Sequence, residues 1–260
     1  MTAPPAEALL PTIDIAGVRV DACTFQEAVD RIVDRARRGG PPAYVVTPNA
    51  HHVVMLQESE RFRRVYDNAW LSLADGMSIV WAAQLLGTPV PEKVSGSDLF
   101  PALCQAAAKA GVRIFLFGGR PGATEAASER LRASYPGLEI AGTYCPPFDF
   151  ENDPVESAKA AEAIRAAAPQ MVFVGLGAPK QEYWMADEGA RLGVPVLVGI
   201  GVSIEFVAGM VKRAPVWMQR SGLEWFYRLA AEPRRLWKRY AVTNPRFVQL
   251  VLQQYRRGRR

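Results

Sequence analysis

The chain has 260 residues, of which 49% are hydrophobic and 22% are charged, and its formal net charge is +5. This length and composition fit one sizeable α/β domain with an appendage and exclude a largely disordered protein. No run approaches the roughly 18 apolar residues of a membrane-spanning helix, and Met1–Glu7 lacks the pattern of a signal peptide, so we expect an intracellular protein.

The first predicted elements are a hairpin and a helix. Residues 13–20 alternate apolar and polar side chains around Gly17, which predicts a β-hairpin. Thr24 and Glu27 have the spacing of a capping box, and apolar residues then recur at helical spacing as far as Val33. We therefore expect an N-terminal hairpin followed by an amphipathic helix.

Six apolar runs, separated by segments of helix length, predict the strands of a buried sheet. They are residues 43–47, 70–74, 112–118, 138–143, 171–175 and 195–200. Because most are apolar on both faces, the fold class is α/β, with a Rossmann-like, mostly parallel sheet flanked by helices. Right-handed crossovers bring the carboxyl ends of such strands to one side, where these sheets bind ligands.

Two strand ends carry polar residues suited to a reaction site. The first apolar run leads into Thr47 and Asn49, and the second leads into Asp75. A carboxylate at the carboxyl end of a buried strand is a candidate base or ligand anchor, although Asp-Gly is also a common turn signal. Asn49 has a second, structural reading as the cap of the helix that follows it.

Three further loops are candidates for ligand contact. Gly118 and Gly119 allow close approach of a backbone to a pyrophosphate, but their spacing is not that of the complete dinucleotide fingerprint. Gln181 begins a helix beside Lys180, where an amide and a lysine can contact a sugar or phosphate, or simply belong to a helix cap. Ser97 or Asp98 is most simply the cap of the next helix along the chain from Lys93.

The histidines and cysteines do not predict a metal site. Adjacent histidines on a helix, such as His51 and His52, point about 100° apart, so we expect them to cap or pack. The cysteines Cys23, Cys104 and Cys145 lie far apart in the sequence without histidines at metal-ligand spacing. We expect reduced, structural cysteines, no metal and no cofactor.

The C-terminal residues 212–260, which we name the appendage, differ in charge from the rest of the chain. The appendage has a net charge of +11 and eight aromatic residues, whereas residues 1–211 have a net charge of −6. Basic residues interleaved with aromatic rings favour docking to an anionic membrane surface. A solvated helix and a nucleic-acid surface are the other readings, and the acidic body makes nucleic acid the weaker of them. We expect a catalytic core at 1–211 and a helical, basic appendage at 212–260.

As a set, these motifs resemble the bacterial WecG/TagA/CpsF glycosyltransferase family over roughly residues 12–240. The segments that carry the resemblance, in matching order, are Thr47–His52, Ala74–Gly76, Val94–Asp98, Gly175–Glu182, Gly222–Trp225, Arg228 and Glu232–Arg235.

The resemblance implies an inverting enzyme that works at the inner face of the plasma membrane. It would move a hexose or an N-acetylhexosamine-type sugar from a UDP-sugar donor to a polyprenyl-diphosphate-linked saccharide acceptor, in the synthesis of a cell-surface polysaccharide. It implies no metal and no nucleic acid, allows a homo-oligomer, and leaves the sugar, acceptor and linkage open.

The resemblance also implies roles for individual residues. Asp75 corresponds to the general base, with Thr47 and Asn49 beside it. Donor or acceptor binding falls to Lys93, Tyr144, Gln181 and Glu205, and diphosphate binding falls to Arg228, Arg235 and Lys238. Lysine replaces the usual arginine at 93 and 238, and glutamate replaces the usual aspartate at 205, so that each charge is kept. The loop 144–148 departs from the family pattern, which leaves open whether Tyr144 or Phe148 packs on the nucleotide base.

Two other classes of function remain as alternatives at the level of the sequence. A nucleotide-dependent Rossmann oxidoreductase would share the parallel sheet, but it should carry the full glycine fingerprint. A non-catalytic protein that binds membrane or nucleic acid would explain the appendage, but it leaves the polar strand ends unexplained.

Overall fold

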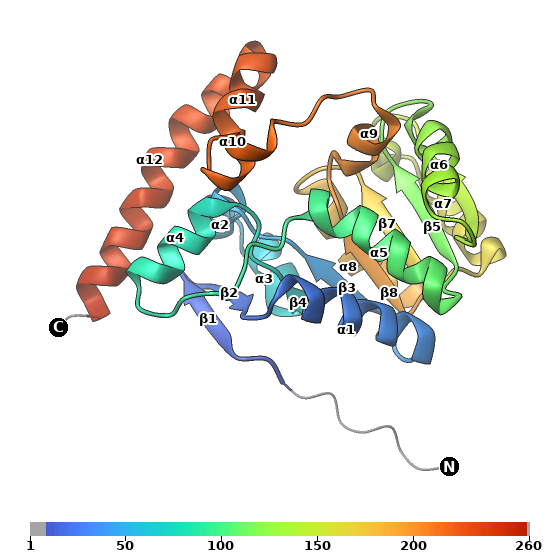
Figure 1. Cartoon of the computed structure of the whole chain (residues 1–260), viewed down its shortest axis with the longest axis horizontal. Helices are drawn as coiled ribbons and strands as arrows, with labels where there is room; N and C mark the ends of the chain where they lie inside the picture. Colours follow the sequence, from blue (N-terminus) through green and yellow to red (C-terminus); the bar gives the residue numbers. More distant parts are fainter. Residues whose placement is uncertain (1–8, 259–260) are drawn as a thin grey trace.

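The computed structural model describes residues 9–258, as a sheet with helices on both faces, a hairpin before it and a helical segment after it (Figure 1). Met1–Glu7, on which the signal-peptide expectation rests, and the last two arginines lie outside the described residues. The predicted α/β class is confirmed.

The central sheet has six parallel strands in the order β4-β3-β8-β7-β5-β6. Their bounds are β3 Ala43–Val46, β4 Leu71–Ser72, β5 Ile114–Gly118, β6 Ile140–Tyr144, β7 Met171–Gly175 and β8 Val196–Gly199. The strand predicted at 70–74 is much shorter than expected. Beyond it the chain still runs beside β3, because Leu73 donates to the Val46 carbonyl at 2.9 Å.

Helices cover the two faces of the sheet because each central strand is apolar on both sides. One face packs against α1 (Phe25–Arg38), α5 (Gly96–Ala110), α6 (Ala123–Ser134) and α9 (Ser203–Ala208). The other packs against α2 (Ala50–Glu58), α3 (Glu60–Asp67), α7 (Pro154–Ala167) and α8 (Lys180–Leu192), with a short 3₁₀ turn at Phe150–Asn152 before α7. Along β7, for example, Phe173 enters the first core and Val172 enters the second.

The helix starts follow the cap chemistry that the sequence predicts, with one correction. The Thr24–Glu27 capping box at α1 is formed, and the Asn49 side chain accepts from the His51 and His52 amides at the start of α2. The prediction that Ser97 or Asp98 caps α5 is wrong. The helix begins at Gly96, and Ser95 takes the cap position, where its hydroxyl donates to Asp98 at 2.7 Å.

The predicted hairpin is confirmed as β1 (Thr12–Ile15) and β2 (Val18–Asp21). It contacts the far end of the appendage, since the Gln254 side chain accepts from the Ala16 amide at 2.6 Å and donates to the Asp14 carbonyl at 2.9 Å. The C-terminal helix is thus tied to the N-terminal hairpin.

Over its described part, residues 212–258, the appendage forms three helices, α10 (Val216–Arg220), α11 (Glu224–Ala231) and the long α12 (Pro233–Gly258). α12 lies across α2 and beside α4 (Met77–Leu85), and it buries Phe247 and Val251 in the same apolar core as Val53 (Figure 1). Within residues 9–258 no helix is both long enough and apolar enough to cross a membrane.

Candidate functional site

Asp75 and Asn49 are brought together by the pairing of β3 with β4. Because the two strands are parallel neighbours, the residues that follow them leave the sheet side by side. The Asp75 amide donates to the Pro48 carbonyl at 3.0 Å, and the Asn49 side-chain amide donates to an Asp75 carboxylate oxygen at 3.4 Å. The juxtaposition predicted from the strand ends is therefore present.

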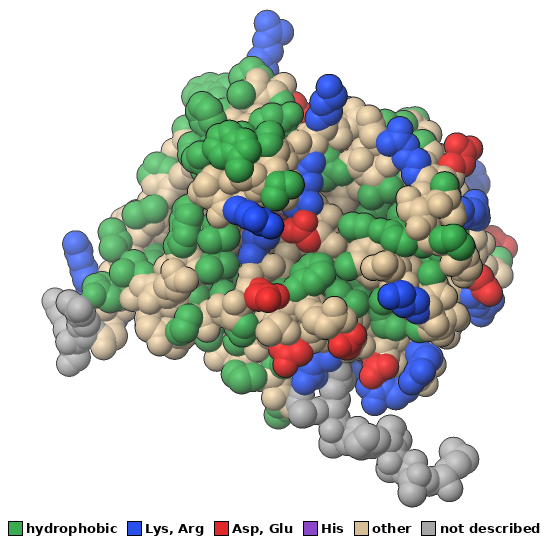
Figure 2. Space-filling view, in the orientation of Figure 1, with side chains coloured by type: hydrophobic (Ala, Val, Ile, Leu, Met, Phe, Trp, Pro, Cys, Tyr) green, Lys and Arg blue, Asp and Glu red, His purple; other side chains and the backbone are tan. Residues whose placement is uncertain are grey.

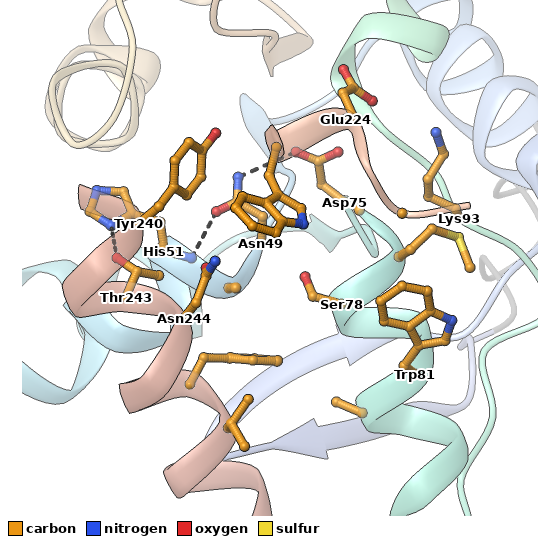
Figure 3. A pocket seen from close by; sticks show the side chains of 18 of the residues that line it. Asn49, His51, Asp75, Ser78, Trp81, Lys93, Glu224, Tyr240, Thr243 and Asn244 are labelled. Atoms are coloured by element: carbon orange, nitrogen blue, oxygen red, sulfur yellow. Dashed lines mark hydrogen bonds between the residues drawn. The ribbon is translucent and has the colours of Figure 1, made fainter. Parts of the chain in front are cut away.

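A cavity of about 440 Å³ opens beside Asp75, between the sheet edge, α4, α11 and α12 (Figure 3). The side chains of Asn49 and Asp75 lie at one end of it, with those of Lys93 and Glu224 close by. Below them Trp81 from α4 faces the cavity from one side and Asn244 from α12 faces it from the other. The appendage thus supplies a whole wall of this space.

The surroundings of Asp75 raise its pKa to about 6. Burial is the largest cause, and the negative charge of Glu224 adds to it. The hydrogen bond from Asn49 and the positive charges of Lys93 and Arg228 act in the opposite direction. A carboxylate whose pKa lies just below neutral pH is suited to accept a proton and to release it again.

An ionic cluster joins the core to the start of the appendage. Asp98 contacts Lys93 at 3.1 Å and Arg213 at 2.6 Å, and Arg213 in turn lies 3.7 Å from Glu224. Burial would raise the pKa of Asp98, but hydrogen bonds from Arg213 and Ser95 and the charge of Lys93 hold it well below its usual range. Asp98 therefore stays ionised and keeps both cations beside the cavity.

Of the three cations expected at a diphosphate, only Arg228 lines the cavity. Arg235 forms an ion pair with Glu232 on the exposed side of α12, and the Lys238 ammonium lies 5.7 Å from the centre of the Trp237 ring.

Arg239, which the sequence reasoning missed, lines the cavity instead. Burial lowers its pKa, and its Nε is buried without a hydrogen-bond partner. The spacing along α12 could have indicated this position, because Arg239 lies one turn from the buried Leu236 and one turn from the buried Thr243 and so shares their face of the helix.

Thr47 and the two histidines have structural contacts. Thr47 is buried outside the cavity lining, and its carbonyl lies 3.2 Å from the ring of His52, whose pKa burial lowers to about 3. His51 lines the cavity, and its ring nitrogen lies 3.1 Å from the Thr243 hydroxyl on α12. Among residues 9–258 no cluster of three or more His, Cys, Asp or Glu is arranged to hold a metal ion.

The remaining candidates lie farther along the same edge of the sheet. Gly118 ends β5 and Gly119 follows it, and β5 is three strands from β3, a distance of about 14 Å. A side chain at Gly118 would come within 2.7 Å of the Gly175 carbonyl, so close strand packing already requires glycine there. Tyr144, at the end of β6, donates its hydroxyl to Glu156 at 3.2 Å.

Gln181 and Glu205 are both buried near these strand ends, but they differ in whether a side-chain atom remains free to bind a ligand. Gln181 accepts from the Gly201 amide at 3.0 Å and donates to Glu182 at 2.9 Å, so its side chain holds the loop after β8. One carboxylate oxygen of Glu205 is buried without a hydrogen-bond partner, and burial raises its pKa. Glu205 thus keeps an open acceptor atom at this end of the site.

Trp81 and Gly222, neither of them predicted, join α4 to the appendage at the cavity. Gly222 lies in the turn between α10 and α11, with a φ of +72°, and its α-carbon packs so closely on the Trp81 ring that a side chain would collide with it. Only the folded arrangement brings these two residues together, although Met77, Trp81 and Leu85 are spaced as one face of a helix.

Comparisons with known proteins find relatives that match most of the chain. A protein of Bacillus spizizenii is 34% identical over 215 residues, which cover 82% of this chain and 80% of the relative. A Bacillus subtilis protein is 35% identical over 70% of this chain and 68% of its own length, and a Staphylococcus aureus protein is 28% identical over 86% of each. All three bear the name N-acetylglucosaminyldiphosphoundecaprenol N-acetyl-β-D-mannosaminyltransferase.

The model of the glycosyl transferase WecG/TagA/CpsF family matches residues 13–260, nearly the whole chain. The match includes the sheet, the Asp75 cavity and the helices of the appendage. It confirms the resemblance seen in the motifs and gives no support to the oxidoreductase or nucleic-acid alternatives. The chain belongs to the WecG/TagA/CpsF family of glycosyl transferases.

Proposed function

We propose that the protein transfers a hexose or N-acetylhexosamine-type sugar, with inversion, from a UDP-sugar to a saccharide linked to a polyprenyl diphosphate. The observation that carries the proposal is the Asp75 carboxylate, with its pKa raised to about 6, at the end of a cavity where Lys93, Arg228 and Arg239 gather. The names of the relatives give the acceptor class: each acts on a sugar joined to undecaprenol through a diphosphate.

The reaction would be a single displacement. An acceptor hydroxyl gives its proton to Asp75 while its oxygen bonds to the anomeric carbon of the donor, and the bond from that carbon to the UDP oxygen breaks. UDP leaves with the bonding electron pair, and attack from the opposite face inverts the anomeric centre. Asn49, which donates to one Asp75 oxygen at 3.4 Å, orients the carboxylate and leaves its other oxygen for the acceptor.

The donor would lie across the strand ends, from Asp75 towards Glu205. The unpartnered Glu205 oxygen suits an N–H or hydroxyl donor of the nucleoside, and the loop at Gly118 allows backbone contact with it. Cations on this chain would offset the charge of the diphosphates, so the proposed reaction needs no metal. Through Arg228 and Arg239 the appendage would take a direct part in the site, opposite Lys93 of the core.

The appendage would also place the enzyme on the membrane that holds its acceptor. Hydrophobic side chains gather on the surface over α10, α11 and the upper part of α12 (Figure 2). They include the exposed Trp217, Phe226 and Trp237. Together with the basic residues around them, these rings suit peripheral contact with an anionic cytoplasmic leaflet.

A transfer assay tests the proposal, with radiolabelled UDP-sugars as donors and N-acetylglucosamine linked through diphosphate to a lipid as the acceptor. We expect one UDP-N-acetylhexosamine to be used and the anomeric configuration of the product to be opposite to that of the donor. Arg228→Met should raise the acceptor KM about tenfold or more, because it removes a charge-assisted contact. Arg234→Met is the matched control, because Arg234 is an exposed arginine of the appendage that does not line the cavity. Absence of transfer from every UDP-sugar would overturn the proposal.

A further inference from the structure

The cavity beside Asp75 continues as an apolar groove between α4 and α12, away from the charged residues. We propose that this groove binds the first isoprene units of the acceptor's polyprenyl chain, while the diphosphate lies at Arg228 and Arg239 and the sugar at Asp75. The inference rests on the proposed function and adds to it a binding site for the hydrocarbon part of the substrate.

The wall formed by α12 changes from polar to apolar along its length. Four lining residues follow one another at intervals of four, which places them on one face of the helix: Tyr240, Asn244, Val248 and Leu252. From the first to the last the helix rises about 18 Å, which is enough for several isoprene units. Tyr240 and Asn244 face the Asp75 end, and Val248 and Leu252 lie at the other.

The wall formed by α4 is apolar where it faces the apolar part of α12. Trp81 and Leu85 line the groove, and 49% and 44% of their surfaces are exposed, which is a high fraction for large apolar side chains. On the opposite wall Val248 is 53% exposed, while Phe247 and Val251 beside it are buried and form the floor. Large apolar side chains lining a continuous exposed surface usually mark a binding site.

Because the charged side chains lie at one end of the cavity and the apolar side chains at the other, the cavity suits an amphiphile with an anionic head. The charged side chains that line the cavity all belong to the end near Asp75: Lys93 and Glu224 lie beside it in Figure 3, and Arg228 and Arg239 are close enough to interact with its charge. Arg239 brings a buried Nε that lacks a hydrogen-bond partner, as expected of a group that awaits an anion. A prenyl diphosphate matches both ends at once: its phosphates meet the cations and its hydrocarbon chain fills the groove.

Binding of short prenyl diphosphates to the full-length protein tests the groove without any donor sugar. Calorimetry in detergent-free buffer compares isopentenyl diphosphate, with one isoprene unit, and farnesyl diphosphate, with three. We expect farnesyl diphosphate to bind the wild-type protein at least about tenfold more tightly, because its longer chain buries more apolar surface. Equal affinities for the two ligands would overturn the proposal, and this comparison needs no variant.

A matched pair of variants locates the contact. Val248→Ser combined with Leu252→Ser should weaken farnesyl diphosphate about tenfold and leave isopentenyl diphosphate unchanged. Val242→Ser is the control, since Val242 is 65% exposed on the same helix but does not line the groove. If the control weakened farnesyl diphosphate as much as the double variant, the hydrocarbon chain would not be held by the groove residues and the proposal would be wrong.

The failure of this inference can be told apart from failure of the proposed function. If the protein transfers sugar to an acceptor with a short alkyl chain but does not prefer farnesyl diphosphate, the groove proposal is wrong and the transferase proposal stands. If farnesyl diphosphate binds in the groove but no UDP-sugar supports transfer, the transferase proposal is wrong and the groove stands.

Discussion

Replacing Asp75 with asparagine should stabilise the protein at neutral pH while it removes the proposed base. Asparagine has nearly the same shape, and its side-chain oxygen can still accept from Asn49. What disappears is a charge held in a partly buried place beside Glu224. The folded protein therefore no longer has to keep a carboxylate ionised where burial disfavours it.

The size of the effect follows from the pKa of Asp75, which is about 6 in the folded protein against a reference of 3.8. Because the folded value is raised, the wild-type protein loses stability as pH rises between these two values. At about 1.4 kcal/mol per pKa unit, the loss is at most about 3 kcal/mol, and water in the cavity reduces it by screening the charge. For a chain of this size the upper limit corresponds to about 10 °C in Tm.

Thermal unfolding of the wild-type protein and the Asp75→Asn variant between pH 4 and pH 8 measures this difference. We expect the difference between the Tm of the variant and that of the wild type to increase in favour of the variant as the pH rises from 4 to 7. Above pH 7 this difference should stay constant. The other titrating groups are common to both proteins and cancel in the comparison. A gap that does not change with pH would refute the reasoning that burial raises this pKa.

Three further predictions concern the same cavity. Glu224→Gln should lower the pH at which kcat/KM reaches half its maximum, because the variant lacks the negative charge that raises the pKa of Asp75; an unchanged pH profile would contradict this. Gly222→Ala should lower Tm more than Gly87→Ala, although both glycines have positive φ, because only a side chain at 222 collides with Trp81. Equal Tm losses would show that this contact is unimportant. Chelation of divalent cations with EDTA should leave the rate of sugar transfer unchanged, and loss of activity restored by Mg²⁺ or Mn²⁺ would show that a metal takes part.

The local parts of the site could be predicted from the sequence. Asp75 and Asn49 each follow an apolar run, and parallel pairing of neighbouring strands is enough to bring them together. The cap at Asn49 and the capping box at Thr24 are likewise decided within a few residues of chain. The start of α5 is not decided so locally, because Ser95 and Ser97 offer equivalent hydroxyls and the packing of Gly96 against the end of β8 selects the earlier start.

The appendage side of the site depends on how one helix lies against another, which the charge pattern alone does not show. Arg235, Lys238 and Arg239 are equally basic in the sequence, but only Arg239 lies on the face of α12 that borders the cavity. The groove has the same origin, since Trp81 and Val248 are far apart in the sequence and become neighbouring walls only when α12 packs beside α4.

The most direct test of the central claim compares chemistry with binding in the Asp75→Asn variant. Single-turnover transfer from the UDP-sugar to the lipid-diphosphate acceptor should slow by about 10²–10⁴-fold, the usual contribution of a general base. UDP binding, measured by calorimetry on the same preparation, should stay within about twofold of the wild-type value. Transfer at the wild-type rate by this variant would contradict the assignment of Asp75 as the base.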